Sequence, residues 1–226
     1  MSIRRAAAAE AIGTGLLLTV VVGSGIMGQR LAQGNMAVAL LANSIATGAG
    51  LYTLIITFGP VSGAHFNPIV SAVSIWDGRL SVRHGVVYVL AQVSGAFAGV
   101  AAAHAMFTLP IIQISARVRP TLGEGFGEAI ATFGLVLVIS LALRHRVEAI
   151  PMAVAAFITS AYWFTSSTSF ANPAVTFARA MTDTFTGISP QSVPLFVCGQ
   201  LLGGASAALL ARWLTGAKPT VKSDRK

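Results

Sequence analysis

Six stretches of the chain are each long enough and apolar enough to cross a lipid bilayer, and this feature constrains the fold more than any other. A helix needs about 20 mainly apolar residues to span the hydrocarbon core. The stretches lie at residues 7–27, 37–58, 84–105, 125–143, 149–167 and 193–214. Charged residues make up only 10% of the 226 positions, whereas a soluble domain carries about a quarter. The sequence therefore predicts an all-α integral membrane protein with six transmembrane helices.

The composition also excludes several other classes of protein. The formal net charge is +8, but the Lys and Arg residues are scattered between apolar runs, unlike the clustered basic face of a nucleic-acid binder. Cys198 is the single cysteine and is expected to pack inside the last span. The histidines lack the spacing of a zinc site, and no catalytic motif is present. We expect no metal, no cofactor, no nucleic-acid partner and no enzymatic activity.

Two shorter apolar segments, at residues 67–75 and 172–181, each begin with an Asn-Pro pair. Asn caps helix N-termini and Pro is favoured at the first helical position. These segments are too short to span a membrane, so they predict two re-entrant half-helices. The N-terminus of each half-helix would carry about half a positive charge and unpaired N–H groups. The amides of Asn67 and Asn172 would then donate hydrogen bonds into a lumen, while Pro68 and Pro173 fix the entry geometry.

The two halves of the chain repeat each other. Asn67 and Asn172 lie 105 residues apart in matching segments, and Glu10 in the first span is matched by Glu128 in the fourth. Three spans per half place the halves in opposite orientations, and such inverted repeats locate a permeation or binding site near the midplane. We expect one membrane domain over residues 1–214, with repeats at about 7–105 and 125–214, and a polar tail at 215–226.

The distribution of basic residues predicts the orientation. With the N-terminus inside, eleven of the 15 Lys and Arg residues fall in inner segments and four in outer segments. Lys and Arg are enriched on the cytoplasmic side of membrane proteins. Both termini are therefore expected to be cytoplasmic.

The two Asn-Pro boxes resemble the paired Asn-Pro-Ala boxes of the aquaporin and aquaglyceroporin (major intrinsic protein) family. The first box reads Asn67-Pro68-Ile69, with Ile in place of Ala, and the second reads Asn172-Pro173-Ala174. The resemblance runs from Glu10 to about Trp213. It implies one pore per subunit, a homotetramer in the lipid bilayer and the passage of small neutral solutes.

Carboxylates within apolar spans are costly and mark functional positions. General acid–base catalysis or a proton relay by Glu10 and Glu128 would need separated pKa environments and a shared substrate. In the family, the matching glutamates accept hydrogen bonds from the re-entrant loops. The resemblance therefore implies that both residues brace these loops.

Family alignment places an outer selectivity filter at Thr47, Ser160, Ser169 and Val175. Most water-selective members carry Arg directly after the second box, where Val175 stands in this chain. A wide, neutral, hydroxyl-lined opening is the expected result. For Ser160, a count shifted by one residue stays open.

Two further residues are predicted to line the vestibules. His65 is expected to line or brace the inner vestibule. Arg179 lies four residues after Val175 on the same helix face, where it would place a cation in the outer vestibule. The alternatives for Arg179 are a side chain that extends to the lipid headgroups or an ion pair with Asp183.

The missing filter Arg resembles the aquaporin branch associated with bacterial arsenic-resistance operons. The resemblance implies a passive channel in a bacterial inner (plasma) membrane for water, glycerol-like polyols, arsenite as As(OH)₃ and methylated arsenicals. An inverted-repeat secondary transporter and a non-conducting scaffold of the same fold are the two alternatives.

Overall fold

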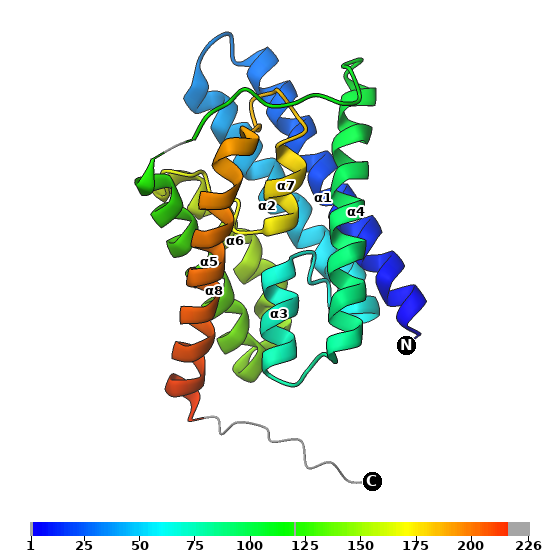
Figure 1. The fold of residues 1–226 in the computed structure, drawn as a ribbon, viewed down its shortest axis with the longest axis vertical. Coiled ribbons are helices and arrows are strands. Elements are labelled where there is room, and N and C mark those ends of the chain that lie inside the picture. Colours follow the sequence, from blue (N-terminus) through cyan, green and yellow to red (C-terminus); the bar gives the residue numbers. More distant parts are fainter. Residues whose placement is uncertain (1, 120, 217–226) are drawn as a thin grey trace.

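The computed structural model describes residues 2–119 and 121–216, and every regular element within these ranges is helical. Six long apolar helices stand side by side as a bundle (Figure 1). A single 3-10 turn, η1 (Val147–Ala149), leads into α6, and η2 (Pro190–Ser192) leads into α8. The six helices are α1 (Ile3–Leu31), α2 (Met36–Ser62), α4 (Val82–Met106), α5 (Leu122–His145), α6 (Ile150–Phe164) and α8 (Val193–Thr215). The predicted six-helix membrane fold is confirmed.

Two short helices occupy the middle of the bundle. They are α3 (Pro68–Trp76) and α7 (Pro173–Arg179), which begin close together and run to opposite ends of the molecule (Figure 1). Each begins as the sequence predicts, with an Asn cap followed by Pro at the first helical position. The second half-helix ends at Arg179, two residues before the end expected from its apolar run.

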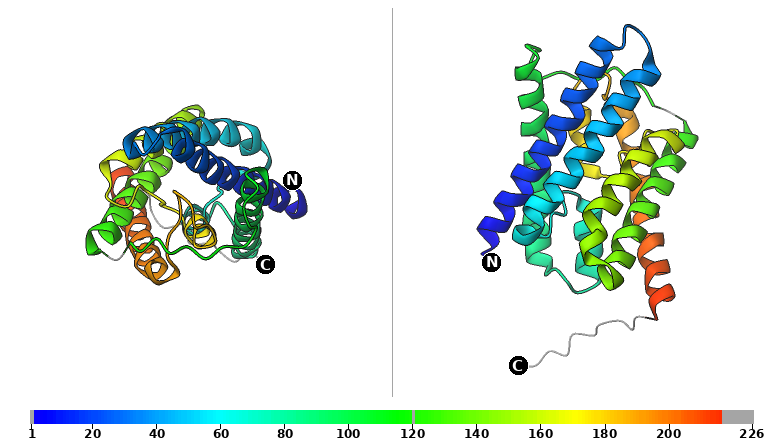
Figure 2. Two further views of the ribbon diagram at one scale, coloured as in Figure 1. Left: turned by 90° about the horizontal axis from the view of Figure 1, so that it is seen from above. Right: turned by 180° about the vertical axis from the view of Figure 1, so that it is seen from behind.

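The two ends of the bundle differ in what they carry. Helix α1 begins and α8 ends at the same end, toward which α3 also runs (Figure 1); we call this the inner end. Helix α7 runs to the opposite, outer end, which the connection between α4 and α5 crosses (Figure 2). Of the tail predicted at residues 215–226, positions 217–226 lie outside the described residues.

Small residues let the helices of each half approach closely. A Cβ atom at Gly99 of α4 would overlap the backbone carbonyl of Gly15 on α1, and one at Gly203 of α8 would overlap that of Ala129 on α5. In lipid, helix association relies on such close packing rather than on the hydrophobic effect. Glycine is therefore required at these crossings.

Large apolar side chains cover the outside of the bundle. On a protein in water, so extensive an apolar surface would promote aggregation, whereas in a bilayer it faces lipid. Examples that are more than half exposed lie on α1, α4 and α8 (Ile12, Leu90, Leu202 and Trp213). With a mean hydropathy of +0.75, this surface identifies an integral membrane protein.

Candidate functional site

The loops that precede the two half-helices are tied to each other in the middle of the bundle. The side-chain amide nitrogen of Asn67 donates to the carbonyl oxygen of Ala171 at 2.7 Å, and that of Asn172 donates to the carbonyl of Phe66, also at 2.7 Å. The amide oxygens are engaged in capping their own half-helices. Because each amide nitrogen carries two hydrogens, one hydrogen per Asn remains for a molecule in the adjacent cavity.

Two buried carboxylates hold these loops in shape. Glu10 accepts the backbone N–H groups of the two residues before Asn67, at 2.9 and 2.7 Å. Glu128 accepts those of the two residues before Asn172, both at 2.8 Å. The residue directly before each Asn has a left-handed backbone, with φ of 48° and 49°, which costs about 1–3 kcal/mol per residue. The carboxylates therefore stabilise a strained conformation.

Two glutamines complete the braces, and the sequence reading missed both. Gln92 of α4 donates to the carboxylate of its own half at 2.8 Å and to Ser71 at 3.0 Å. Gln200 of α8 makes the matching bonds at 2.6 Å and, to Thr176, at 2.8 Å. Each glutamine thus links a buried carboxylate to a half-helix. A polar amide side chain within an apolar span is the sequence signal that could have revealed them.

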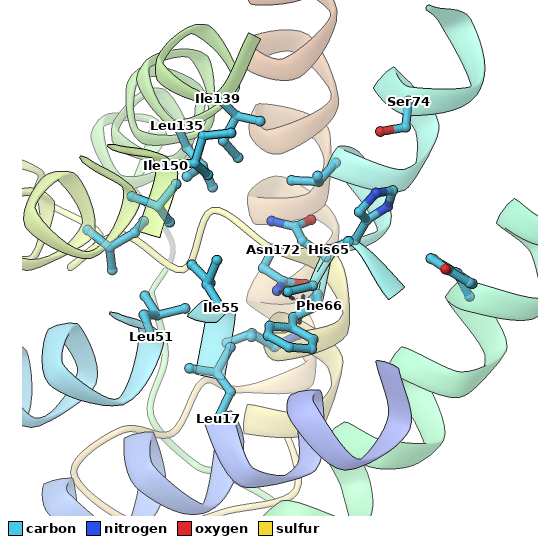
Figure 3. A pocket seen from close by; sticks show the side chains of 18 of the residues that line it. Leu17, Leu51, Ile55, His65, Phe66, Ser74, Leu135, Ile139, Ile150 and Asn172 are labelled. Atoms are coloured by element: carbon cyan, nitrogen blue, oxygen red, sulfur yellow. Dashed lines mark hydrogen bonds between the residues drawn. The ribbon is translucent and has the colours of Figure 1, made fainter. Parts of the chain in front are cut away.

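A cavity of about 450 Å³ runs beside the half-helices, with lining residues from Arg79 near the inner end to Arg179 near the outer end. Its two walls differ in chemistry (Figure 3). His65 and Asn172 supply polar atoms on the side of the re-entrant loops. Aliphatic side chains of α2, α5 and α6 form the opposite wall (Leu51, Ile55, Leu135, Ile139 and Ile150). Where these side chains face each other, a molecule in the cavity finds hydrogen-bonding partners only on the side of the re-entrant loops.

Hydroxyl groups line the outer part of the cavity. Thr47 of α2 and Tyr162 of α6 both line it, and their oxygens lie 3.1 Å apart. Ser169 and Val175 line the same part of the cavity from the second loop and α7. The hydroxyl of Ser169 is buried and has no hydrogen-bond partner in the described part of the chain. The structure therefore brings Thr47, Ser169 and Val175 together.

Arg179 also reaches this part of the cavity. Its side chain is 2% exposed, its Nε donates to the carbonyl of Thr186, and its guanidinium lies over the ring of Phe170, 3.4 Å from the centroid. Such stacking combines cation–π attraction with van der Waals contact. The outer cavity therefore carries a fixed cation.

Comparison with known proteins identifies the family. Residues 1–147 match the family model described as Major intrinsic protein. The chain belongs to the major intrinsic protein family. It is 52% identical over 219 residues to the Aquaglyceroporin AqpS of Rhizobium meliloti (strain 1021), covering 96% of this chain and 94% of that protein.

Two other proteins also resemble this major intrinsic protein. The Probable aquaporin AqpM of Archaeoglobus fulgidus is 30% identical over 248 residues, covering 95% of this chain and 98% of that protein. The X-ray structure of the aquaglyceroporin from Plasmodium falciparum has a TM-score of 0.72 at 20% identity and covers 92% of this chain and 95% of that one. This last likeness shows the fold.

Ser160 does not belong to the site of this major intrinsic protein, contrary to the count from the family motif. Its side chain is exposed on the outside of α6 and donates to the carbonyl of Phe157 at 2.7 Å. The cavity-facing residues of α6 recur every four positions, at Val154, Ile158 and Tyr162. A residue midway between two of them points away from that face. Tyr162 and Ile158 take the place expected for Ser160.

The structure decides between the alternatives for Arg179. The carboxylate of Asp183 accepts the backbone N–H of Ala116 at 2.9 Å, and no ion pair joins it to Arg179 among the described residues. Burial of the guanidinium also contradicts extension to the lipid headgroups. Both alternatives are wrong, because Phe170 and Thr186 hold the side chain inside the protein.

His65 lies in the cavity, whereas Cys198 lies on the surface of the bundle. His65 lines the cavity, with Nδ1 3.1 Å from the hydroxyl of Ser71 and its ring edge-on to that of Tyr88. Cys198 was expected to be buried but is exposed on α8. It lies on a different face of the helix from Gly199 and Gly203, which pack against α5. Among residues 2–119 and 121–216, no cluster of metal-ligating side chains is present.

Proposed function

We propose that this chain forms a passive channel for small uncharged solutes, including water and glycerol-like polyols. The observation that carries the proposal is the cavity beside two half-helices, to which Asn67 and Asn172 present amide donors. Two of the proteins that resemble the chain are named aquaglyceroporins. Their names support the same solute class.

The middle of the cavity favours neutral molecules over cations. Two half-helix N-termini meet there, each with about half a positive charge. A cation that has lost its water therefore meets an unfavourable potential, whereas a hydroxyl oxygen accepts a hydrogen bond from Asn67 or Asn172. The aliphatic wall opposite offers no competing partner, so the solute keeps one orientation.

The outer part of the cavity sets the range of solutes. We assign the selectivity filter to Thr47, Tyr162, Ser169 and Val175. Three hydroxyls can hydrogen-bond the oxygens of a polyol or of arsenite as As(OH)₃, and Val175 adds an apolar surface without charge. Methylated arsenicals carry both hydroxyl and methyl groups, which match the same surfaces.

We further propose that residues 1–214 form one membrane domain of two inverted repeats, at about 7–105 and 125–214, which assembles as a homotetramer in a bacterial plasma membrane. The excess of Lys and Arg in the inner segments supports cytoplasmic termini. The start of α1 and the end of α8 lie at one end of the bundle (Figure 1), as this topology requires.

A secondary transporter, a scaffold and an enzyme are less consistent with the site. A transporter needs a carboxylate free to take a coupling ion, whereas Glu10 and Glu128 already accept loop N–H groups with both oxygens. A scaffold of this fold would not need amide donors facing a cavity. We therefore assign transport without coupling, and the likeness to proteins named aquaporins and aquaglyceroporins favours a channel over an enzyme.

The test is solute flux into proteoliposomes. Stopped-flow light scattering should show water and glycerol permeabilities above those of empty liposomes, and arsenite uptake should rise linearly with concentration. Saturable uptake with counterflow stimulation would indicate a transporter. Flux equal to that of empty liposomes would overturn the proposal and favour the scaffold.

A further inference from the structure

Two buried arginines lie against the ring of Phe170 at the outer end, and they differ in what they face. The guanidinium carbon of Arg179 is 3.4 Å from the ring centroid and that of Arg119 is 5.2 Å from it. The two side chains are 2% and 6% exposed. Arg179 lines the cavity, whereas Arg119 does not contribute to the lining that the structure describes.

Arg119 is bound to the protein itself. A terminal nitrogen of its guanidinium donates to the carbonyl of Ser167 at 3.0 Å, and its backbone N–H donates to the hydroxyl of Ser192 at 2.8 Å. Burial lowers the pKa of this guanidinium to about 10. The guanidinium therefore stays charged at neutral pH. Its hydrogen bond attaches the connection between α4 and α5 to the segment that precedes the second re-entrant loop.

Arg179 keeps donors available for the cavity. The carbonyl of Thr186 takes the hydrogen of Nε, and within residues 2–119 and 121–216 no acceptor is bonded to the two terminal nitrogens. Stacking on Phe170 fixes the plane of the group. A guanidinium carries five N–H donors and is always charged, so four of them remain for a molecule in the cavity.

The position of this cation follows from the spacing on α7. Val175 and Arg179 lie four residues apart and both line the cavity, so the charge is displaced by one turn, about 5.4 Å, from Val175, the position directly after the second Asn-Pro box. The wall beside the box is apolar and short. The cation lies on the outer side of this wall.

We propose that Arg179 determines specificity at the outer mouth, with Phe170 and Thr186 as its positioning residues. Its charge excludes cations, and its terminal N–H groups bind an oxygen of an incoming neutral solute, while Val175 leaves the adjacent constriction wide enough for a polyol. The inference rests on the proposed channel function. Val175 then sets the width of the constriction, and Arg179 sets the charge of the outer mouth.

Elementary electrostatics supports this division. The interaction of two unit charges grows as the dielectric constant falls, about fourfold between water and an effective dielectric constant of 20. A guanidinium one turn from the constriction therefore still repels a cation there. A neutral solute gains a charge-assisted hydrogen bond in the same place.

The decisive experiment compares two arginines that share one aromatic ring. Arg179→Gln, Arg179→Lys and the matched control Arg119→Gln are reconstituted, and K⁺ influx and water permeability are measured in the same proteoliposomes. We expect Arg179→Gln to raise K⁺ influx at least tenfold relative to water permeability. Arg179→Lys should keep K⁺ excluded and change the glycerol-to-water ratio, because an ammonium lacks the planar fork. Arg119→Gln should exclude K⁺ as the wild type does.

Each outcome bears on the inference. Unchanged K⁺ exclusion in Arg179→Gln overturns it, and so does an equal leak in both Gln variants, because that leak would come from a loosened Phe170. If Arg179→Gln does not insert, Arg179→Met replaces it, since an unbranched side chain keeps the packing against the ring. A wild-type protein that passes no solute would refute the proposed channel function, which is a different result from a failure of the inference about Arg179.

Discussion

The hydroxyl oxygens of Thr47 on α2 and Tyr162 on α6 lie 3.1 Å apart in the outer part of the cavity, so a hydrogen bond joins the two helices there. Thr47 was expected there from the family pattern, but its partner was not. Tyr162 presents a large ring with one polar atom to the pathway. Through Tyr162, α6 therefore affects both the width of the pathway and its hydrogen bonds to a solute.

Tyr162→Phe should therefore change selectivity without unfolding the protein. Loss of the phenolic oxygen leaves Thr47 free to rotate and removes one partner for a polyol, so the glycerol-to-water permeability ratio should fall several-fold. Ser160→Ala is the matched control on the same helix, because Ser160 is exposed and bonded only to its own helix. A change of ratio in Ser160→Ala but not in Tyr162→Phe would restore the original count from the motif.

Asn67→Asp and Asn172→Asp replace an amide donor by an acceptor-only carboxylate opposite a backbone carbonyl. Leaving that buried carbonyl unpaired costs about 1–3 kcal/mol, and the new charge cancels the positive potential of the half-helices. We expect lower neutral-solute flux or a new cation leak, measured by light scattering and K⁺ influx. Asn43→Asp is the control, since the buried Asn43 also donates to a carbonyl, at 2.9 Å, away from the cavity.

Asn43→Asp should reduce stability but leave cations excluded. Wild-type flux and cation exclusion in both re-entrant-loop variants would show that Asn67 and Asn172 do not act in the pathway.

Glu128→Gln should destabilise the second re-entrant loop. Glutamine offers one oxygen where the carboxylate uses two, so one loop N–H loses its acceptor and the new amide group faces the donor of Gln200. The expected loss is about 1–3 kcal/mol in the free energy of unfolding, seen as a lower melting temperature in detergent. Glu124→Gln, near the exposed start of the same helix, affects only a helix cap and should cost about 1 kcal/mol or less. Equal effects would contradict the bracing role.

Val175→Arg would place a second guanidinium one turn before Arg179. The longer side chain narrows the pathway, so glycerol and arsenite flux should fall much more than water flux, because larger solutes reach the steric limit first. Paired flux measurements at matched protein per liposome check this. Glycerol passing the variant as fast as the wild type would place Val175 away from the constriction.

Sequence alone predicted the membrane fold well because its determinants are local. Apolar length defines the six spans, and an Asn cap followed by Pro defines the start of each half-helix. The halves also correspond through Glu10 and Glu128, but it was the family resemblance that implied that these residues brace the re-entrant loops. The spans, the half-helix starts and the repeat can each be recognised from a short stretch of sequence or from the match between the two halves.

The positions that sequence missed depend on contacts between distant segments. A motif at Asn172 fixes the residues of α7, but the length of the preceding loop decides which face of α6 meets the cavity, and this displaced Ser160. Burial of Arg179 depends on Phe170 and Thr186, which neither its charge nor its spacing reveals. Gln92 was hidden because a single polar residue hardly changes the hydropathy of a span.

The crossed hydrogen bonds between the two loops make the midplane a joint product of both halves. Neither half contains both a donor amide and the carbonyl that receives it, so either half expressed alone would expose an unpaired carbonyl and an unpaired amide within the membrane. Two separate polypeptides corresponding to the halves must therefore assemble before a pathway exists. A mutation that displaces one loop therefore also removes a hydrogen-bond partner from the loop of the other half.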